Sequence, residues 1–95
     1  MSKVEAKVEA KVEMYSSVLC PFCMAAKRLL SSKGVDFTEH DVDDDEEVRA
    51  AMIERAGGRK TVPQIFINER HIGGYDELSH LESAGALDEL LSSSD

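Results

Sequence analysis

The two cysteines of this chain are the residues whose type and spacing most directly suggest chemistry. They stand in the segment Cys20-Pro21-Phe22-Cys23, and the chain holds no other cysteine. A pair at this spacing can form a redox-active disulfide or supply half of a structural zinc site. A zinc site needs two further ligands, but the sequence has no second CxxC and no HxxxH pattern. We therefore expect a redox-active dithiol rather than a metal site.

The Val62-Pro63 peptide bond is a second feature that could serve a dithiol. X-Pro bonds are the only peptide bonds with an accessible cis isomer. A cis bond ahead of an inner strand would direct the N–H and C=O of Val62 outward, where an extended thiol peptide could form hydrogen bonds. An ordinary turn proline is the alternative.

The third feature is the segment Gly73-Gly74-Tyr75-Asp76. Paired glycines ahead of a helix leave backbone N–H groups free to receive a carboxylate. An ordinary turn at the end of a strand is the alternative interpretation.

The elements around the cysteines would place Cys20 at the start of a helix. Residues 11–16 alternate apolar and polar side chains and predict a strand. Pro21 to Lys33 predicts a helix, with proline in its first position and Gly34 after its end. Its apolar face is expected to consist of Phe22, Ala25, Ala26, Leu29 and Leu30.

This placement gives the two sulfurs different roles. At the helix N-cap, unpaired N–H groups and the helix dipole favour the thiolate of Cys20 over the thiol. The same stabilisation makes this sulfur a good leaving group. Cys23 lies one turn further along, on the more buried side, where it can resolve a mixed disulfide formed at Cys20. Pro21 donates no N–H and leaves the Cys20 sulfur facing solvent.

The rest of the chain continues to alternate strands and helices. We expect a second strand over Val35 to Val42, and then a helix that is capped by Asp43 or Asp44 and ends at Gly57-Gly58. A hairpin follows, in which Gln64 to Ile67 pairs with His71-Ile72 across the turn Asn68-Glu69-Arg70. A helix opened by Asp76 or Ser79 and a last turn with Leu87, Leu90 and Leu91 complete the chain. In this β-α-β-α-β-β-α(-α) order, the first two strands are parallel and the last two form an antiparallel hairpin. This order of elements predicts a four-stranded mixed sheet with helices on both faces. That architecture is the thioredoxin-like α/β fold.

Composition and charge narrow the class of protein. The 95 residues are enough for one domain. The formal net charge of −8 argues against nucleic acid as a partner, because phosphate binding needs a basic surface. No stretch approaches the roughly 20 apolar residues of a membrane span, and no export signal precedes the cysteines, so we expect a cytoplasmic protein.

The first residues repeat a four-residue unit. Lys3-Val4-Glu5-Ala6 recurs at residues 7–10. A register slip by four residues keeps every side chain on its face of a sheet, so the repeat could fray or could lengthen the first strand. We therefore divide the chain into an N-terminal extension over residues 1–10, a domain over residues 11–91 and a tail over residues 92–95.

Together, these motifs in this order resemble the glutaredoxin family, and the short bacterial dithiol glutaredoxins in particular. The matching segments are CPFC at 20–23, AKRLLSSKGV at 26–35, TVPQIFI at 61–67 and HIGGYDEL at 71–78. The resemblance covers about residues 11–91. It implies a glutathione-dependent thiol–disulfide oxidoreductase that reduces protein–glutathione mixed disulfides and protein disulfides, with Cys20 attacking and Cys23 resolving.

The resemblance also implies a glutathione site. The residues that it assigns are Thr61 and Val62, beside Pro63, for the glutathione backbone; Gly74, Tyr75 and Asp76 for the γ-glutamyl end; Lys60, with Arg59, for the glycyl carboxylate; and Phe22 for the wall of the groove. Members usually carry Tyr at the position of Phe22, and often an additional Cys at that of Tyr75. Ser17 stands where many members carry a lysine, which removes one thiolate-stabilising cation.

Two other functions stay open at this level. Two protomers, each giving Cys20, and two glutathiones could bridge a [2Fe-2S] cluster, although members with proline after the first cysteine bind clusters less readily. A zinc-stapled interaction module is the other. The partners implied by the resemblance are glutathione and glutathionylated or disulfide-containing proteins such as ribonucleotide reductase, without nucleic acid, membrane or metal. We expect a monomer, with dimerisation through the repeat strand as the alternative.

Overall fold

The computed structural model describes residues 10–92 of the chain. The expected N-terminal extension, apart from Ala10, and the tail after Ser92 lie outside these residues. The elements are, in chain order, β2 (Val12–Ser16), α1 (Pro21–Ser32), β3 (Thr38–Asp41), α2 (Glu46–Arg55), β4 (Gln64–Ile67), β5 (Arg70–Gly73), α3 (Tyr75–Ser83) and α4 (Leu87–Leu91).

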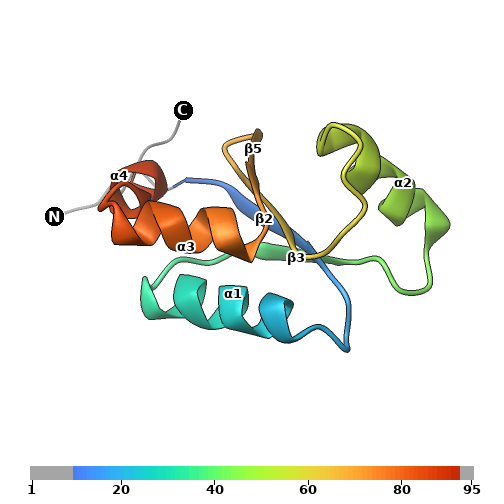
Figure 1. Cartoon of the computed structure of the whole chain (residues 1–95), viewed down its shortest axis with the longest axis horizontal. Coiled ribbons are helices and arrows are strands. Elements are labelled where there is room, and N and C mark those ends of the chain that lie inside the picture. Colours follow the sequence, from blue (N-terminus) through green and yellow to red (C-terminus); the bar gives the residue numbers. More distant parts are fainter. Residues whose placement is uncertain (1–9, 93–95) are drawn as a thin grey trace, which may run out of the picture.

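The four strands form one mixed sheet in the order β3-β2-β4-β5 (Figure 1). β2 is parallel to β3 and antiparallel to β4, and β4 pairs with β5 in an antiparallel hairpin. The two hairpin strands are joined by Asn68 and Glu69, which both have positive φ. The topology predicted from the order of elements is therefore confirmed.

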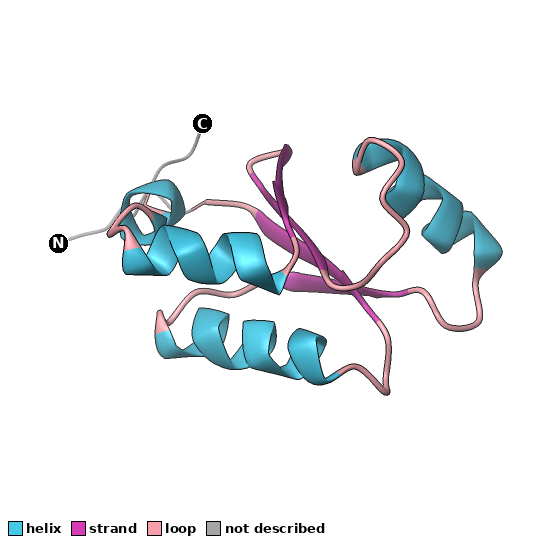
Figure 2. Ribbon diagram, viewed as in Figure 1, coloured by secondary structure: helices cyan, strands magenta, loops and turns pink. Residues whose placement is uncertain are grey.

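The helices form layers on the two faces of this sheet (Figure 2). Val12 and Met14 of β2 point toward α1, α3 and α4, where they join a core with Ala26, Leu30 and Leu78. The alternate residues of β2 point toward α2. The core on that face is smaller and consists of Tyr15, Val42, Met52, Ala56 and Phe66. No helix within residues 10–92 is long and apolar enough to cross a membrane.

The second strand is shorter than predicted. The sequence indicated a strand from Val35 to Val42, but pairing is confined to β3. In the parallel register Thr38 lies opposite Glu13, so residues before Phe37 extend past the start of β2 and have no strand to pair with. The side chains of Val35 and Phe37 pack against the larger core instead.

The starts of α2 and α3 also differ from the prediction. Asp45 caps α2, because its carboxylate accepts hydrogen bonds from the N–H groups of Glu47 and Val48 at 3.0 and 3.2 Å. α3 begins at Tyr75 with Gly74 as its N-cap, not at Asp76 or Ser79. Its cap is the carboxylate of Glu77, which accepts the Gly74 N–H at 2.7 Å.

An ion pair between a buried carboxylate and a partly buried guanidinium fixes α2 to the sheet. Glu13 is one of the charged residues in the alternating pattern of β2, yet it is buried. Both of its carboxylate oxygens accept hydrogen bonds from Arg55, at 3.0 and 3.2 Å, and Arg55 also donates to the Tyr15 hydroxyl at 2.9 Å. The guanidinium lies 4.0 Å from the ring centroid of Phe66. Hydrogen bonding to Arg55 holds the pKa of Glu13 below its ordinary value despite burial.

Candidate active site

Cys20 lies where the prediction placed it, at the N-cap of α1. Its sulfur accepts a hydrogen bond from the Cys23 N–H at 3.0 Å. The two cysteines form a disulfide across a Cα–Cα distance of 5.1 Å. Cys20 retains 8% exposure, whereas Cys23 is fully buried. An incoming reactant therefore reaches the Cys20 sulfur first, and a thiolate released there is stabilised by the helix end.

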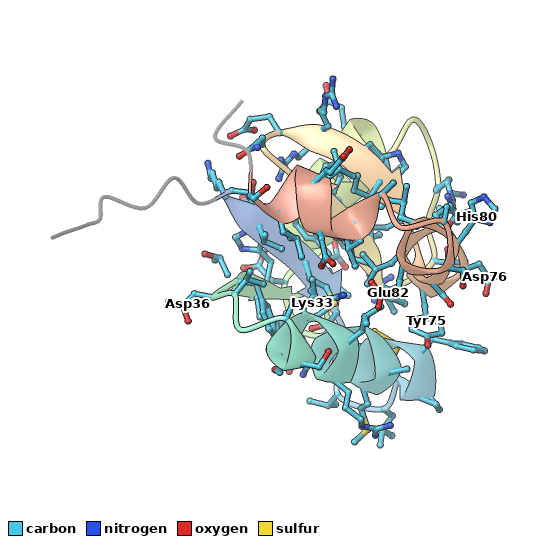
Figure 3. The ribbon with its side chains drawn as sticks, turned by 90° about the vertical axis from the view of Figure 1, so that its left-hand side faces the viewer. Lys33, Asp36, Tyr75, Asp76, His80 and Glu82 are labelled. Atoms are coloured by element: carbon cyan, nitrogen blue, oxygen red, sulfur yellow. A yellow bond between two sulfur atoms is a disulfide. The ribbon has the colours of Figure 1, made fainter. Side chains whose placement is uncertain are left out.

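The apolar face of α1 is narrower than predicted and excludes Phe22. The helix buries Cys23, Ala26 and Leu30 in the core. Phe22 is 61% exposed, and its ring stacks on that of Tyr75 with the centroids 6.2 Å apart. Figure 3 shows Tyr75 and Asp76 at the end of α3 that faces the start of α1. The two rings therefore link the first turns of α1 and α3.

The loop before β4 faces the cysteine pair. The Val62-Pro63 bond is cis, as the sequence reasoning favoured, and the carbonyl oxygen of Val62 lies 3.7 Å from the Cys20 sulfur. Gln64, which the sequence analysis did not single out, holds this loop from inside the protein. Its buried side-chain amide donates to the carbonyl oxygen of Thr61 at 3.0 Å and is itself in contact with His71 at 2.6 Å.

The Gly73-Gly74 segment forms the opposite side of the site. Glu77 accepts the Gly74 N–H, and this hydrogen bond lowers the pKa of its carboxyl group. The other carboxylate oxygen of Glu77 lies 3.6 Å from the Arg59 guanidinium. A carboxylate and a guanidinium therefore face each other across the two loops, an arrangement that sequence spacing alone did not indicate.

Between these parts lies a groove of about 260 Å³. It is lined by Phe22, Arg59, Thr61, Val62, Pro63, Gly74, Tyr75, Asp76 and Glu77. The fold thus brings together every residue assigned to the glutathione groove except one. Lys60 is exposed and does not line the groove; its neighbour Arg59 supplies the positive charge there.

Ser17, which stands at the position of the absent lysine, holds the loop before Cys20. Its hydroxyl donates to the Asp43 carboxylate at 2.6 Å, and the N–H of Val18 donates to the same carboxylate at 2.9 Å. These bonds lower the pKa of Asp43. They also explain why Asp43 does not cap α2. Within residues 10–92, no three His, Cys, Asp or Glu side chains are grouped as a metal site requires.

The fold and the site together define a class of protein. The sheet is thioredoxin-like, a dithiol lies at the start of the first helix, and a cis-proline loop faces the sulfur. These features are those of the thiol–disulfide oxidoreductases of this fold. Residues 12–72 match the sequence model of one family in that class, Glutaredoxin. The chain belongs to the glutaredoxin family, as the resemblance of its motifs implied.

Individual relatives agree with this assignment. The chain is 54% identical to glutaredoxin 3 of Escherichia coli K12 over 82 residues, which cover 86% of this chain and 98% of the relative. The solution structure of glutaredoxin from Brucella melitensis superposes with a TM-score of 0.80 at 45% identity, covering 93% of this chain and 95% of that one.

A second solved structure, the buckwheat glutaredoxin–glutathione complex, has a TM-score of 0.79 at 27% identity and covers 86% of this chain and 76% of that one. Family membership and the intact cysteine pair make this protein a glutathione-dependent thiol–disulfide oxidoreductase of the dithiol type.

Proposed function

We propose that the groove between the α1 start, the cis-proline loop and the α3 start binds glutathione, and that the protein reduces both protein–glutathione mixed disulfides and protein disulfides. The observation that carries this proposal is the 3.7 Å separation between the Cys20 sulfur and the Val62 carbonyl oxygen. Because Val62 also lines the groove, the reactive sulfur lies at the groove's edge. A ligand bound there would present its own sulfur to Cys20.

The groove offers a different partner to each part of glutathione. The backbone groups of Val62, at the edge of the groove, suit the extended peptide, as they would an added strand. The N-terminal end of α3, at Tyr75 and Asp76, suits the γ-glutamyl carboxylate because both residues line the groove and a helix N-terminus favours a negative charge. Arg59 suits the glycyl carboxylate in place of Lys60. The complex of the buckwheat relative with glutathione supports glutathione as the ligand.

For a mixed disulfide, the Cys20 thiolate attacks the glutathione sulfur. A bond forms between these two sulfurs, the original disulfide bond breaks, and the substrate leaves as a thiolate. A second glutathione thiolate then attacks the glutathione sulfur on Cys20. This step releases glutathione disulfide and regenerates the Cys20 thiolate.

For a protein disulfide, both cysteines take part. Cys20 attacks one substrate sulfur and displaces the other as a thiolate. The thiolate of Cys23 then attacks the Cys20 sulfur, releases the reduced substrate and leaves the Cys20–Cys23 disulfide, the state found in this structure. Glutathione returns the pair to the dithiol form in two exchange steps.

The test is steady-state turnover of a small glutathione mixed disulfide, coupled to glutathione reductase, together with reduction of a protein disulfide. Cys20→Ser is expected to abolish both activities, because it removes the nucleophile. Cys23→Ser is expected to retain turnover of the mixed disulfide and to lose reduction of the protein disulfide. Turnover of the mixed disulfide by Cys20→Ser at the wild-type rate would refute the proposal.

A further inference from the structure

A chain of hydrogen bonds runs from the edge strand β5 to the cis-proline loop. Gln64 is fully buried, and its side-chain nitrogen lies 3.0 Å from the carbonyl oxygen of Thr61 and 3.3 Å from the Thr61 hydroxyl. Its side-chain oxygen lies 2.6 Å from Nε2 of His71, on β5. Neither Gln64 nor His71 lines the groove. Any effect of this pair on the reaction must therefore pass through the loop.

The register of the hairpin brings His71 to Gln64. His71 lies opposite Phe66 of β4, and Gln64 is two residues before Phe66, so the three side chains share one face of the sheet. The imidazole ring packs against the ring of Phe66, with the centroids 5.1 Å apart. This packing holds the imidazole with Nε2 directed at the amide of Gln64.

The partners of Gln64 assign the hydrogen atoms of this chain of bonds. A carbonyl oxygen can only accept, so the NH₂ of Gln64 faces Thr61 and its oxygen faces His71. Nε2 of His71 must then carry a hydrogen and donate it. Burial, and after it the positive charge of Arg59, lower the pKa of His71. The ring is therefore neutral at pH 7 and holds its one proton on Nε2.

The peptide unit between Thr61 and Val62 translates this anchor into an orientation. The unit is trans, and in a trans unit the C=O and the N–H point in opposite directions. Gln64 holds the C=O of Thr61 toward the buried side of the loop. The N–H of Val62 is therefore directed away from the interior, on the side where Val62 lines the groove.

Resting on the proposed function, we infer that His71 is a positioning residue: through Gln64 it fixes the orientation of the Val62 N–H, and thereby the affinity of the groove for the backbone of glutathione. Without the donor on His71, the buried oxygen of Gln64 loses this partner, and the amide can rotate away from Thr61 to find another. The peptide unit then gains freedom that glutathione must remove on binding. Because Cys20 and its helix end stay unchanged, KM should respond and kcat should not.

The test is steady-state turnover of the mixed disulfide of glutathione and 2-mercaptoethanol, coupled to glutathione reductase. His71→Phe keeps a ring against Phe66 but lacks the donor, and should raise KM about fivefold with kcat unchanged. His71→Gln places an amide nitrogen near the position of Nε2 and should restore the KM of the wild type. His80→Phe, the matched control at an exposed histidine of α3, should leave both constants unchanged.

A double-mutant cycle separates a relay through Gln64 from a general loss of structure. Gln64→Met keeps the length of the side chain without its amide, and should raise KM at least as much as His71→Phe. Because both substitutions act on the same carbonyl group, adding His71→Phe to Gln64→Met should raise KM no further. Urea denaturation checks that each variant is folded under the assay conditions. In the wild type, ¹⁵N NMR of the ring should find the proton of neutral His71 on Nε2.

Three outcomes would overturn the inference while the wild type still turns over the mixed disulfide. The first is a wild-type KM in His71→Phe. The second is a cycle in which the effects of the two substitutions multiply, because each residue would then act independently. The third is a neutral His71 ring with its proton on Nδ1. Absence of turnover by the wild type would instead refute the proposed function.

Discussion

Arg59 and Lys60 are adjacent cations, but only Arg59 lines the groove. We expect Arg59→Gln to raise the KM for a small glutathione mixed disulfide about fivefold, with little change in kcat, because a charge pair at a partly exposed site contributes about 1 kcal/mol. Lys60→Gln is the matched control and should change KM less than twofold. Steady-state kinetics at low salt measures both. A larger effect at Lys60 would assign the glycyl carboxylate to that residue, as the family resemblance had suggested.

Gly73 and Gly85 both have positive φ, at +121° and +77°, but their surroundings differ. A Cβ at Gly73 would lie 2.7 Å from the Glu77 carboxylate, whereas one at Gly85 would meet no atom within 4 Å. Gly85→Ala is therefore expected to lose about 1 kcal/mol for its backbone conformation alone. Gly73→Ala must also displace Glu77 from the Gly74 N–H, and should lose about 1 kcal/mol more.

Urea denaturation of the two alanine variants measures the difference in the free energy of unfolding. Because Gly74 and Glu77 line the groove, Gly73→Ala should also raise the KM for glutathione substrates, and Gly85→Ala should not. Equal stability and equal KM in the two variants would show that the carboxylate of Glu77 adapts without loss.

At the scale of elements, α2 depends on the pair between Glu13 and Arg55. Glu13→Gln keeps the shape of the side chain but removes its charge, and we expect a loss of about 2 kcal/mol at pH 7. The control is Glu69→Gln, since Glu69 also contacts Arg55 but is 65% exposed. It should change stability by less than about 0.5 kcal/mol. Urea midpoints at fixed pH compare the two.

The same pair predicts how stability depends on pH. Glu13 has a lower pKa in the folded protein than in the unfolded chain. Its contribution is therefore complete above the unfolded value of about 4.3 and is lost as pH falls through the folded value. The stabilities of the wild type and Glu13→Gln should differ at pH 7 and converge as the pH falls through the folded pKa of Glu13. Parallel curves over this range would show that the charge of Glu13 is not the source of the stability.

The order of the elements and the position of Cys20 at the start of a helix could be predicted because the sequence signals for strands, helix starts and helix ends are local. Alternation in residues 11–16, the proline at position 21 and the glycines after helices each act over a few residues. The cap of α2 could not be chosen locally, since Asp43, Asp44 and Asp45 are all capable caps. Asp43 is taken by Ser17 and Val18, from a loop that only the folded chain brings near.

Contacts between residues far apart in the sequence also explain why the roles of Glu13 in the core and Gln64 at the site were not predicted. Glu13 and Arg55 are 42 residues apart, and an alternating strand pattern assigns Glu13 to solvent unless the partner is known. Gln64 was passed over because its role depends on Thr61 and His71 in three dimensions. The residues predicted for the glutathione site come from three short segments, and all but Lys60 line one groove. The choice between Arg59 and Lys60 depended on the path of one loop.

For the whole molecule, the two sheet edges favour a monomer. The edge strand β3 has the sequence Thr-Glu-His-Asp, and β5 begins with the exposed Arg70 and His71. Charged edges oppose pairing with a second sheet. We expect light scattering to give the mass of one chain, both for the full chain and for a variant that begins at Ala10. A dimer of the full chain alone would assign strand pairing to the KVEA repeat.

The two ends of the described part of the chain lie side by side. The N–H of Ala10 donates to the carbonyl oxygen of Leu91, the last residue of α4, at 3.2 Å, and the start of α1 lies away from this point, at the end of α1 nearer to α2 (Figure 1). A polypeptide joined at either side therefore departs at a distance from the sulfur. The domain could be tethered to a fluorescent reporter, or its two ends could be joined into a ring, while the groove stays open to its substrates.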